Sequence, residues 1–310
     1  MNIGVVFPQV EIGQDPSVVR DYAQAVEAMG YTHILVFDHV LGANPQRPGG
    51  WKGPYTYRHL FHEPLVLFGY LAAVTQRVEL VTGILILPQR QTALVAKQAA
   101  AVDVLSGGRL RLGVGVGWNA VEFEALGEDF TNRGKRVEEQ IAVMRALWSQ
   151  ELVTFQGQWH RITDAGINPL PARRSIPVWM GGESEVVLHR AARIADGWMP
   201  HFRPSPEAQA IVDRLHGGIR AAGRDPAQFG IEGRLALANV PPEQRAKEVA
   251  AWRAMRGITH LCVHTVGLGL TSPGEHVKVL EQFKNNILIR PLTVYSGPEP
   301  RDYVPMEQRG

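Results

Sequence analysis

Several segments of this 310-residue chain place residues that can move a proton or bind a ligand directly after an apolar run. One of them is Asp38-His39, which follows the run His33–Phe37. A histidine at the end of a buried segment can act as acid, base or hydrogen-bond donor near neutral pH. Asp38 is not expected to face the same way as its neighbour. The structural alternative is a loop histidine beside a turn-capping aspartate.

Glycines accompany two further apolar runs. Gly83 lies inside Val78–Leu87, and a glycine within a strand pattern indicates a bulge or a close approach of the backbone to a ligand. The segment that begins at Leu110 reads LRLGVGVGWN, with glycine at every second position from 113 to 117. That spacing keeps one face free of side chains, as a ring system lying against the strand end would require. A packing glycine is the alternative explanation for Gly83. The second pattern is no dinucleotide fingerprint, because position 118 is Trp.

Another glycine pair precedes a helical pattern. Met180 is followed by Gly181-Gly182-Glu183-Ser184 and then by an apolar stripe with helical spacing. Glycines that enter a helix leave backbone N–H groups pointing outward, with the helix dipole behind them. These residues are therefore candidates for a phosphate site, to which Ser184 would add a hydroxyl. A plain turn with Ser184 as the helix N-cap is the alternative.

The elements that would position these residues can be read from the apolar periodicity. Longer stretches of helical period, such as Thr92–Leu105, separate short apolar runs, and some helices begin at capping residues such as Asp15 and Ser272. Most of the runs are continuous, which suits strands buried on both faces. The predicted strands are Ile3–Pro8, His33–Phe37, Val78–Leu87, Leu110–Val116, Pro177–Met180, Gly197–Met199, Ile231–Ala238 and His260–His264.

Eight strands alternating with helices predict an α/β fold, a (β/α)8 TIM barrel with insertions at its C-terminal mouth. An open doubly wound sheet fits the alternation too, but its glycine fingerprint is absent from the first strand-to-helix turn, which reads PQVEIG. The insertions are Leu41–His62 and Leu152–Ile176, the second with a hairpin at Val153–Ile162. We expect the barrel domain over residues 1–287 and an extended tail over 288–310. The strand ends of a barrel would bring the candidate segments together.

Composition excludes several classes of protein. The 32 basic and 30 acidic residues leave a net charge of +2, which gives no electrostatic basis for binding nucleic acid or a membrane surface. The single Cys262 excludes an internal disulfide and a cysteine-based metal site, and it fits a reducing compartment. We read no signal peptide and no run of about 18 apolar residues, so a cytoplasmic location is expected. His59 and His62 lack further ligand partners, so no metal site is predicted.

Together, three segments resemble the bacterial luciferase-like flavin and deazaflavin oxidoreductases. They are Phe37-Asp38-His39, the stretch VTGILILPQRQTALVAKQAAAVDVLSGGRLRLGVGVGWN at 81–119, and MGGES with ADGWMP inside 180–200. The likeness extends over about residues 1–287. Within that superfamily, an Asp-His pair after the second strand resembles the branch that uses the 8-hydroxy-5-deazaflavin coenzyme F-420.

The resemblance implies a TIM barrel, usually dimeric, with the coenzyme ring at the C-terminal mouth. It implies that His39 is catalytic and lies near the reactive C5 of a deazaflavin or N5 of a flavin. Several relatives have a non-prolyl cis peptide at the bulge, so a cis or strongly distorted peptide is expected near Gly83. The residues implied to bind the coenzyme are Asp38, Thr82, Gly83, Ile84, Gly117, Trp118, Asn119, Gly181, Gly182 and Ser184.

Three functions remain open at this point. The favoured one is hydride transfer between coenzyme F-420 and a small substrate, apolar or aromatic because Trp51, Tyr55, Tyr57 and Trp118 are candidate walls. Sugar-phosphate dehydrogenases of this branch have a glutamate near the position of Trp118, which argues against that substrate. The second is a two-component monooxygenase that uses O2 and reduced FMN from a separate reductase. The third is a barrel that stores or carries a flavin without catalysis.

Overall fold

The computed structural model describes residues 1–288 as a closed parallel barrel, so the predicted TIM barrel is confirmed and the open sheet is not adopted. β3 and β4 are two parts of one strand, and β3 pairs with β2 on one side and β5 on the other, which closes the ring. All the predicted strands are present. They are β1 (Asn2–Val6), β2 (His33–Val36), β3 (Glu79–Thr82), β4 (Leu85–Ile86), β5 (Leu110–Gly115), β8 (Val178–Gly181), β9 (Gly197–Met199), β10 (Gly230–Ala236) and β11 (His260–His264).

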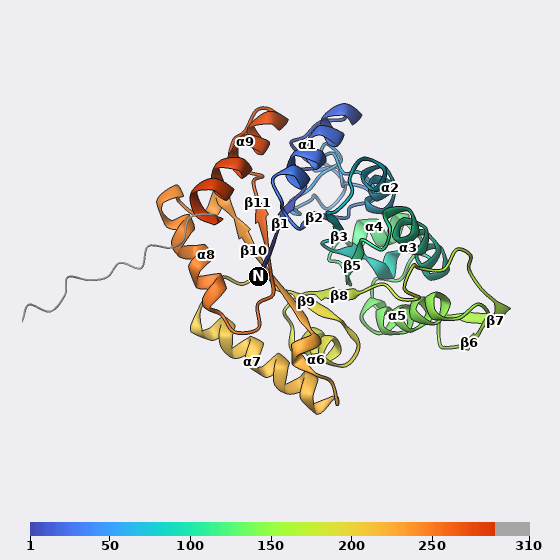
Figure 1. Ribbon diagram of the computed structural model, residues 1–310. Coiled ribbons are helices and arrows are strands. Elements are labelled where there is room, and N and C mark those ends of the chain that lie inside the picture. The colour runs from blue at the N-terminus through green and yellow to red at the C-terminus, as the bar shows by residue number, and fades with distance from the viewer. Residues whose placement is uncertain (289–310) are drawn as a thin grey trace, which may run out of the picture.

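Helices surround the strands, as Figure 1 shows. The expected start of the first helix is confirmed, because the Asp15 carboxylate accepts a hydrogen bond from the Ser17 N–H at 2.8 Å. The last helix begins with the expected capping box of Ser272 and Glu275. The helices are α1 (Pro16–Ala28), α2 (Pro64–Val74), α3 (Thr92–Ser106), α4 (Ala120–Ala125), α5 (Arg133–Ser149), α6 (Glu185–Ile194), α7 (Pro206–Ala221), α8 (Arg245–Ala254) and α9 (Pro273–Phe283).

Both insertions are present, but the second does not lie at the C-terminal mouth as expected, because it connects the end of α5 with the start of β8. The second forms the expected antiparallel hairpin, β6 (Val153–Gln156) and β7 (Arg161–Ala165), which projects beyond α5 in Figure 1. The first has no helix and only an isolated bridge between Ala43 and Thr56. The tail predicted over 288–310 lies outside the described residues, apart from Leu288. Within residues 1–288, no helix combines the length and the apolar character needed to cross a membrane.

A polar layer fills the N-terminal half of the barrel interior. The guanidinium of Arg111 donates to Glu232 at 2.5 Å and to Glu79 at 2.9 Å, and it lies 4.2 Å from the ring centroid of Trp179. The ring of His33 contacts the other oxygen of Glu232 at 3.2 Å. Burial acts to raise the pKa of Glu232, but the charge of Arg111 and the contact with His33 hold it well below its usual range. The layer is therefore a mutually neutralising network.

An apolar layer lies directly above this network. Inward-facing residues recur at every second position of a barrel strand, so successive inward-facing residues of one strand lie in successive layers. Cys262 is buried in this layer and also lies near His33 and Glu232, a group with ligand-type atoms within 4.8 Å of one another. The positive charge of Arg111 in the same network opposes binding of a metal cation there. The layer consists of Val6, Leu35, Val81, Met199 and Cys262.

Candidate active site

A cavity of about 430 Å³ opens at the C-terminal ends of the strands. This volume is in the usual range for small-molecule sites. The predicted residues that line it are Asp38, His39, Gly83, Ile84, Gly117, Trp118, Gly181, Gly182 and Ser184, brought together from β2, β3, β4, β5 and β8 and the loops that follow these strands. Closure of the barrel therefore unites segments that are up to about 150 positions apart in the chain.

His39 is held in place by a buried carboxylate. Its Nδ1 lies 3.1 Å from Oε1 of Glu122, and the same oxygen accepts the backbone N–H of Val40 at 3.0 Å. The Glu122 side chain is 1% exposed and that of His39 is 11% exposed. A carboxylate can only accept, so Nδ1 carries the proton and Nε2 is the nitrogen left free for chemistry. The sequence reasoning did not find Glu122, which lies on the short helix α4.

Aromatic rings surround the imidazole of His39. The ring centroids of Tyr55 and Phe61 each lie 4.8 Å from it, and that of Trp118 lies 5.8 Å away. Trp51 packs against Trp118 at 5.8 Å, so the first insertion contributes to one wall of the mouth. Tyr57, the other candidate for a wall, is 57% exposed and does not line the cavity. The imidazole is therefore partly shielded from water.

Asp38 faces a different set of partners from His39, as the sequence predicts. One carboxylate oxygen accepts from Arg90 Nη2 at 2.7 Å and the other accepts the backbone N–H of Ile86 at 2.8 Å. Arg90 also donates to Glu63 at 2.8 Å. The hydrogen bond to Ile86 holds the segment after Gly83 in place. The carboxylate of Asp38 is fully buried, so it offers no oxygen to a ligand.

The floor of the cavity is formed by the segment after β3. The Gly83–Ile84 peptide is cis, which confirms the expectation of a cis or distorted bond there. Gly115, one of the alternating glycines that were expected to keep one face bare, instead makes room for a side chain. A Cβ atom at Gly115 would overlap Cδ1 of Ile84, and one at Gly181 would lie 2.8 Å from its Cγ2. Ile84 fills the space beside Gly115 and Gly181, so a planar ring there would rest on this side chain and not on bare backbone.

The N-terminus of α6 borders the same cavity. Ser184 is its N-cap, and its hydroxyl accepts the Val187 N–H at 3.4 Å. Gly182 has a φ of +116°, a conformation that side chains rarely adopt, and it turns the chain into the helix. The first N–H groups of a helix lack intrahelical partners and attract anions. The capping role and the phosphate role of this segment are therefore compatible.

Two predicted residues lie outside the lining of this cavity. The hydroxyl of Thr82 is buried and donates to the Gly113 carbonyl at 2.7 Å. Asn119 caps α4 by accepting the Val121 N–H at 3.1 Å. It borders a smaller cavity that His39 also lines. Thr82 thus supports the floor from below, and Asn119 supports the helix that carries Glu122.

Two basic residues were missed by the sequence reasoning. Arg234 of β10 and His201, which follows β9, both line the cavity. The guanidinium carbon of Arg234 lies 5.0 Å from the ring centroid of Phe37. Burial and the charge of Arg234 lower the pKa of His201, so this histidine is neutral at pH 7. The two-residue alternation of β10 from the inward-facing Glu232 could have revealed Arg234.

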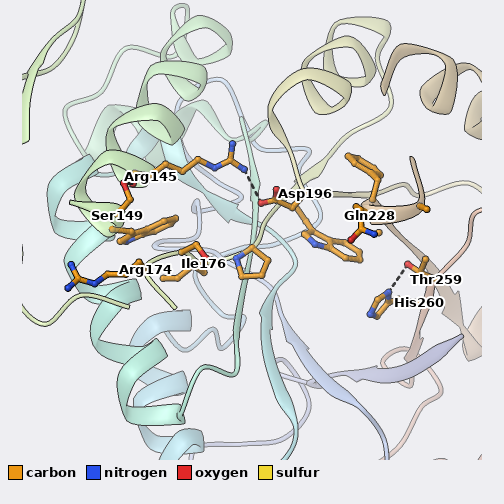
Figure 2. Close-up of a pocket in the computed structure, with 15 residues that line it drawn as sticks. Arg145, Ser149, Arg174, Ile176, Asp196, Gln228, Thr259 and His260 are labelled. Carbon is orange, nitrogen blue, oxygen red and sulfur yellow. Dashed lines mark hydrogen bonds and ion pairs between the residues drawn. The ribbon is translucent and has the colours of Figure 1, made fainter. Parts of the chain in front are cut away.

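A second hollow, of about 650 Å³, lies at the opposite end of the barrel (Figure 2). Its lining includes Trp179 and His260 at the N-terminal parts of β8 and β11. Asp196 there accepts from Arg145 and from the Val178 N–H, each at 2.9 Å, and Figure 2 draws the first of these contacts. These carboxylate contacts hold the loops under the barrel together. The N-terminal face of a TIM barrel contributes to stability, so we assign no chemistry to this hollow.

Residues 1–287 match the protein family described as luciferase-like monooxygenase. An uncharacterized protein of Mycobacterium tuberculosis is 34% identical over 224 residues, which cover 70% of this chain and 77% of the relative. An FMNH2-dependent dimethylsulfone monooxygenase of Pseudomonas putida is 30% identical, over 78% of this chain and 65% of the relative. An F-420-dependent glucose-6-phosphate dehydrogenase of Nakamurella multipartita is also 30% identical, over 67% of this chain and 60% of the relative. The chain belongs to the luciferase-like monooxygenase family.

The fold is shared with solved structures. An F-420-dependent secondary alcohol dehydrogenase, bound to an F-420–acetone adduct, superposes with a TM-score of 0.73 at 19% identity. The match covers 91% of this chain and 97% of the other. This likeness concerns the barrel alone. Members of the family are flavin- or F-420-dependent oxidoreductases and monooxygenases, so the chain is an enzyme of that class.

Proposed function

We propose that the protein transfers hydride between coenzyme F-420 and a small organic substrate, as the Asp38-His39 pair suggests by its likeness to that branch. The observation that carries the proposal is that His39, held by Glu122 at 3.1 Å, lines the same cavity as Ile84 and Ser184. His39 can donate or accept a proton, the side chain of Ile84 can support a ring, and the N-terminus of α6 at Ser184 can bind a phosphate.

The residues of the cavity fit such a coenzyme. Ile84 offers an apolar surface for the ring, and Gly115 and Gly181 leave room for that side chain. Gly182, Ser184 and the N-terminus of α6 would hold the phosphate of the tail. When bound, the deazaflavin supplies hydride at its C5 position.

The other residues of the mouth would assist in three ways. His39, with its proton fixed at Nδ1 by Glu122, presents Nε2 for proton exchange with the substrate. Tyr55 and Trp118 restrict water near the imidazole. Asp38 and Arg90 brace the floor through their buried ion pair at 2.7 Å. The protein thus contributes orientation, one proton carrier and a sheltered face.

A two-component FMN monooxygenase is the second candidate. A relative with this chemistry is 30% identical, and the phosphate of FMN would meet the same helix end. A separate reductase would then supply reduced FMN, and O2 would be the second substrate. The two proposals share every residue named above, so the choice of coenzyme must be measured.

The test is a titration of the purified protein with FMN and with F-420, followed by ligand fluorescence. The first proposal expects F-420 to bind more tightly than FMN. Tight binding of FMN alone would favour the FMN monooxygenase instead.

In the protein loaded with its coenzyme, His39→Ala should lower turnover by about 10²–10⁴-fold while coenzyme binding and thermal stability stay near wild type. Near-normal turnover of this variant would refute the role of His39. A protein that binds coenzyme without substrate-dependent oxidation of it would be a storage barrel.

We further propose that the protein is a homodimer, as the resemblance implies. α2 and α3 lie side by side and expose large apolar side chains to solvent. Val66 on α2 is 70% exposed and Leu94 on α3 is 51% exposed. The segment of α2 has no charged residue, which suits contact with a second copy of the same face.

A further inference from the structure

Arg234 is a cation at the mouth of the barrel. Within residues 1–288, no acidic side chain lies within 4.0 Å of its guanidinium. Asp38, which lines the same cavity, is paired with Arg90. The other lining acid is Glu183, whose carboxylate accepts the backbone N–H of His201. A partly buried guanidinium without a partner is costly, so a site of this kind favours an anionic ligand.

The side chains around Arg234 are neutral and supply no counter-ion. Its guanidinium carbon lies 5.0 Å from the ring of Phe37, which stacks on His264 at 5.8 Å. Burial and the charge of Arg234 lower the pKa of His264 to about 4, so this histidine is neutral at pH 7. Tyr55 contributes a neutral phenol, because burial raises its pKa. Arg234 is thus the fixed positive charge of the cavity.

The position of Arg234 separates it from the surface assigned to the coenzyme. Around the barrel, β10 stands four strands from the β3–β4 strand in either direction, so it lies opposite Gly83 and Ile84. Arg234 follows Glu232 by two residues and faces inward one layer higher, at the floor of the mouth. A molecule resting on Ile84 leaves the Arg234 side of the cavity to a second molecule.

We propose that Arg234 binds the carboxylate of the substrate, which is then a small organic acid with an apolar or aromatic body. This inference rests on the proposed function, since it places the substrate opposite the coenzyme surface. It narrows the expected substrate class, because the walls at Tyr55 and Trp118 suit an apolar body and Arg234 requires an anion. The pairing of guanidinium with carboxylate would also orient the substrate relative to His39.

The experiment compares acids with their neutral amides of the same shape. Benzoate and benzamide, phenylacetate and phenylacetamide, and hexanoate and hexanamide are titrated by calorimetry into the protein saturated with its coenzyme. At least one acid should bind about 10–100-fold more tightly than its amide. Arg234→Met should remove this preference and leave the affinity for the amide within about twofold. Arg234→Lys should retain a reduced preference, and it serves as the test if the methionine variant fails to fold.

Arg203→Met is the matched control, because Arg203 is exposed and pairs with Glu248 at 2.9 Å. It should keep the wild-type preference. The proposal fails if no pair shows a preference for the acid, if the preference survives in Arg234→Met, or if coenzyme competes with the acid, which would assign Arg234 to the coenzyme. If neither coenzyme binds, the proposed function fails by itself, and the same titrations of the apoprotein by tryptophan fluorescence still test Arg234.

Discussion

The contact between His39 and Glu122 decides which imidazole nitrogen is available at the mouth. Glu122 accepts from Nδ1 of His39 at 3.1 Å and from two backbone N–H groups of the same segment, those of Val40 and Leu41. The carboxylate therefore fixes both the tautomer and the orientation of the ring. We regard Glu122 as a positioning residue, because it contacts His39 and does not line the main cavity.

Replacing this carboxylate by an amide tests that role. Glu122→Gln should lower kcat by about 10–100-fold, a smaller loss than removal of the imidazole, and should leave KM nearly unchanged. The ¹⁵N shifts of the His39 ring should report a single Nδ1–H tautomer in the wild type and a mixture in the variant. The control is Glu124→Gln, two residues away, whose carboxylate is 77% exposed. Unchanged ring shifts in Glu122→Gln would contradict the assignment.

At the level of single residues, the sequence could identify the site residues that lie at or near the end of a predicted strand. His39 and Gly83 stand out because they end or interrupt an apolar run. Glu122 does not, since it acts through His39, which only the closed barrel brings near. Arg234 was missed although it follows the inward-facing Glu232 by two residues on β10. The sequence could not show that Ile84 fills the space beside Gly115, because this side chain comes from the segment between β3 and β4.

At the level of elements, the fit between β5 and the segment after β3 determines the floor of the cavity. Gly115→Ala would place a methyl group on Cδ1 of Ile84. We expect a loss of about 1–3 kcal/mol in the free energy of unfolding and weaker coenzyme binding, because the floor must shift. Thermal or chemical denaturation and coenzyme titration measure the two effects.

The contact also suggests a rescue. Ile84→Val removes the Cδ1 atom, so Gly115→Ala combined with Ile84→Val should recover most of the lost stability. The control is Gly217→Ala on α7, where no atom lies within 4 Å of the added Cβ and the exchange should be neutral or stabilising. A single variant at position 115 that is as stable as wild type would show that the floor adapts without cost.

The strands of the fold were predictable, and part of the helical layer was not. Buried parallel strands are short continuous apolar runs, and every predicted run became a strand. The segment of α2 reads PLVLFGYLAAV, which is apolar on all sides and therefore has no helical stripe. The short α4 gives too little periodicity to be recognised. Both helices matter for function, since α4 carries Glu122 and α2 belongs to the proposed dimer face.

At the level of the whole molecule, the exposed face of α2 and α3 predicts the oligomeric state. The double variant Val66→Glu and Leu94→Glu should be monomeric, because it would place like charges opposite each other in a symmetric interface. Light scattering after size exclusion measures this. The control is Leu152→Glu, where a leucine with 62% exposure belongs to neither helix. A dimeric double variant, or a monomeric wild type, would exclude this face as the interface.

The two filled layers below Ile84 have a consequence for the traffic of ligands. The polar layer with Arg111 and Glu232 fills the N-terminal half of the barrel interior, and the apolar layer with Cys262 fills the space between it and the mouth. No ligand of the mouth can therefore leave through the far end of the described barrel. The molecule that rests on Ile84 and the one beside it at Arg234 must both enter and leave through the same opening. A coenzyme that gives up its hydride in each turnover would therefore share its exit with the product.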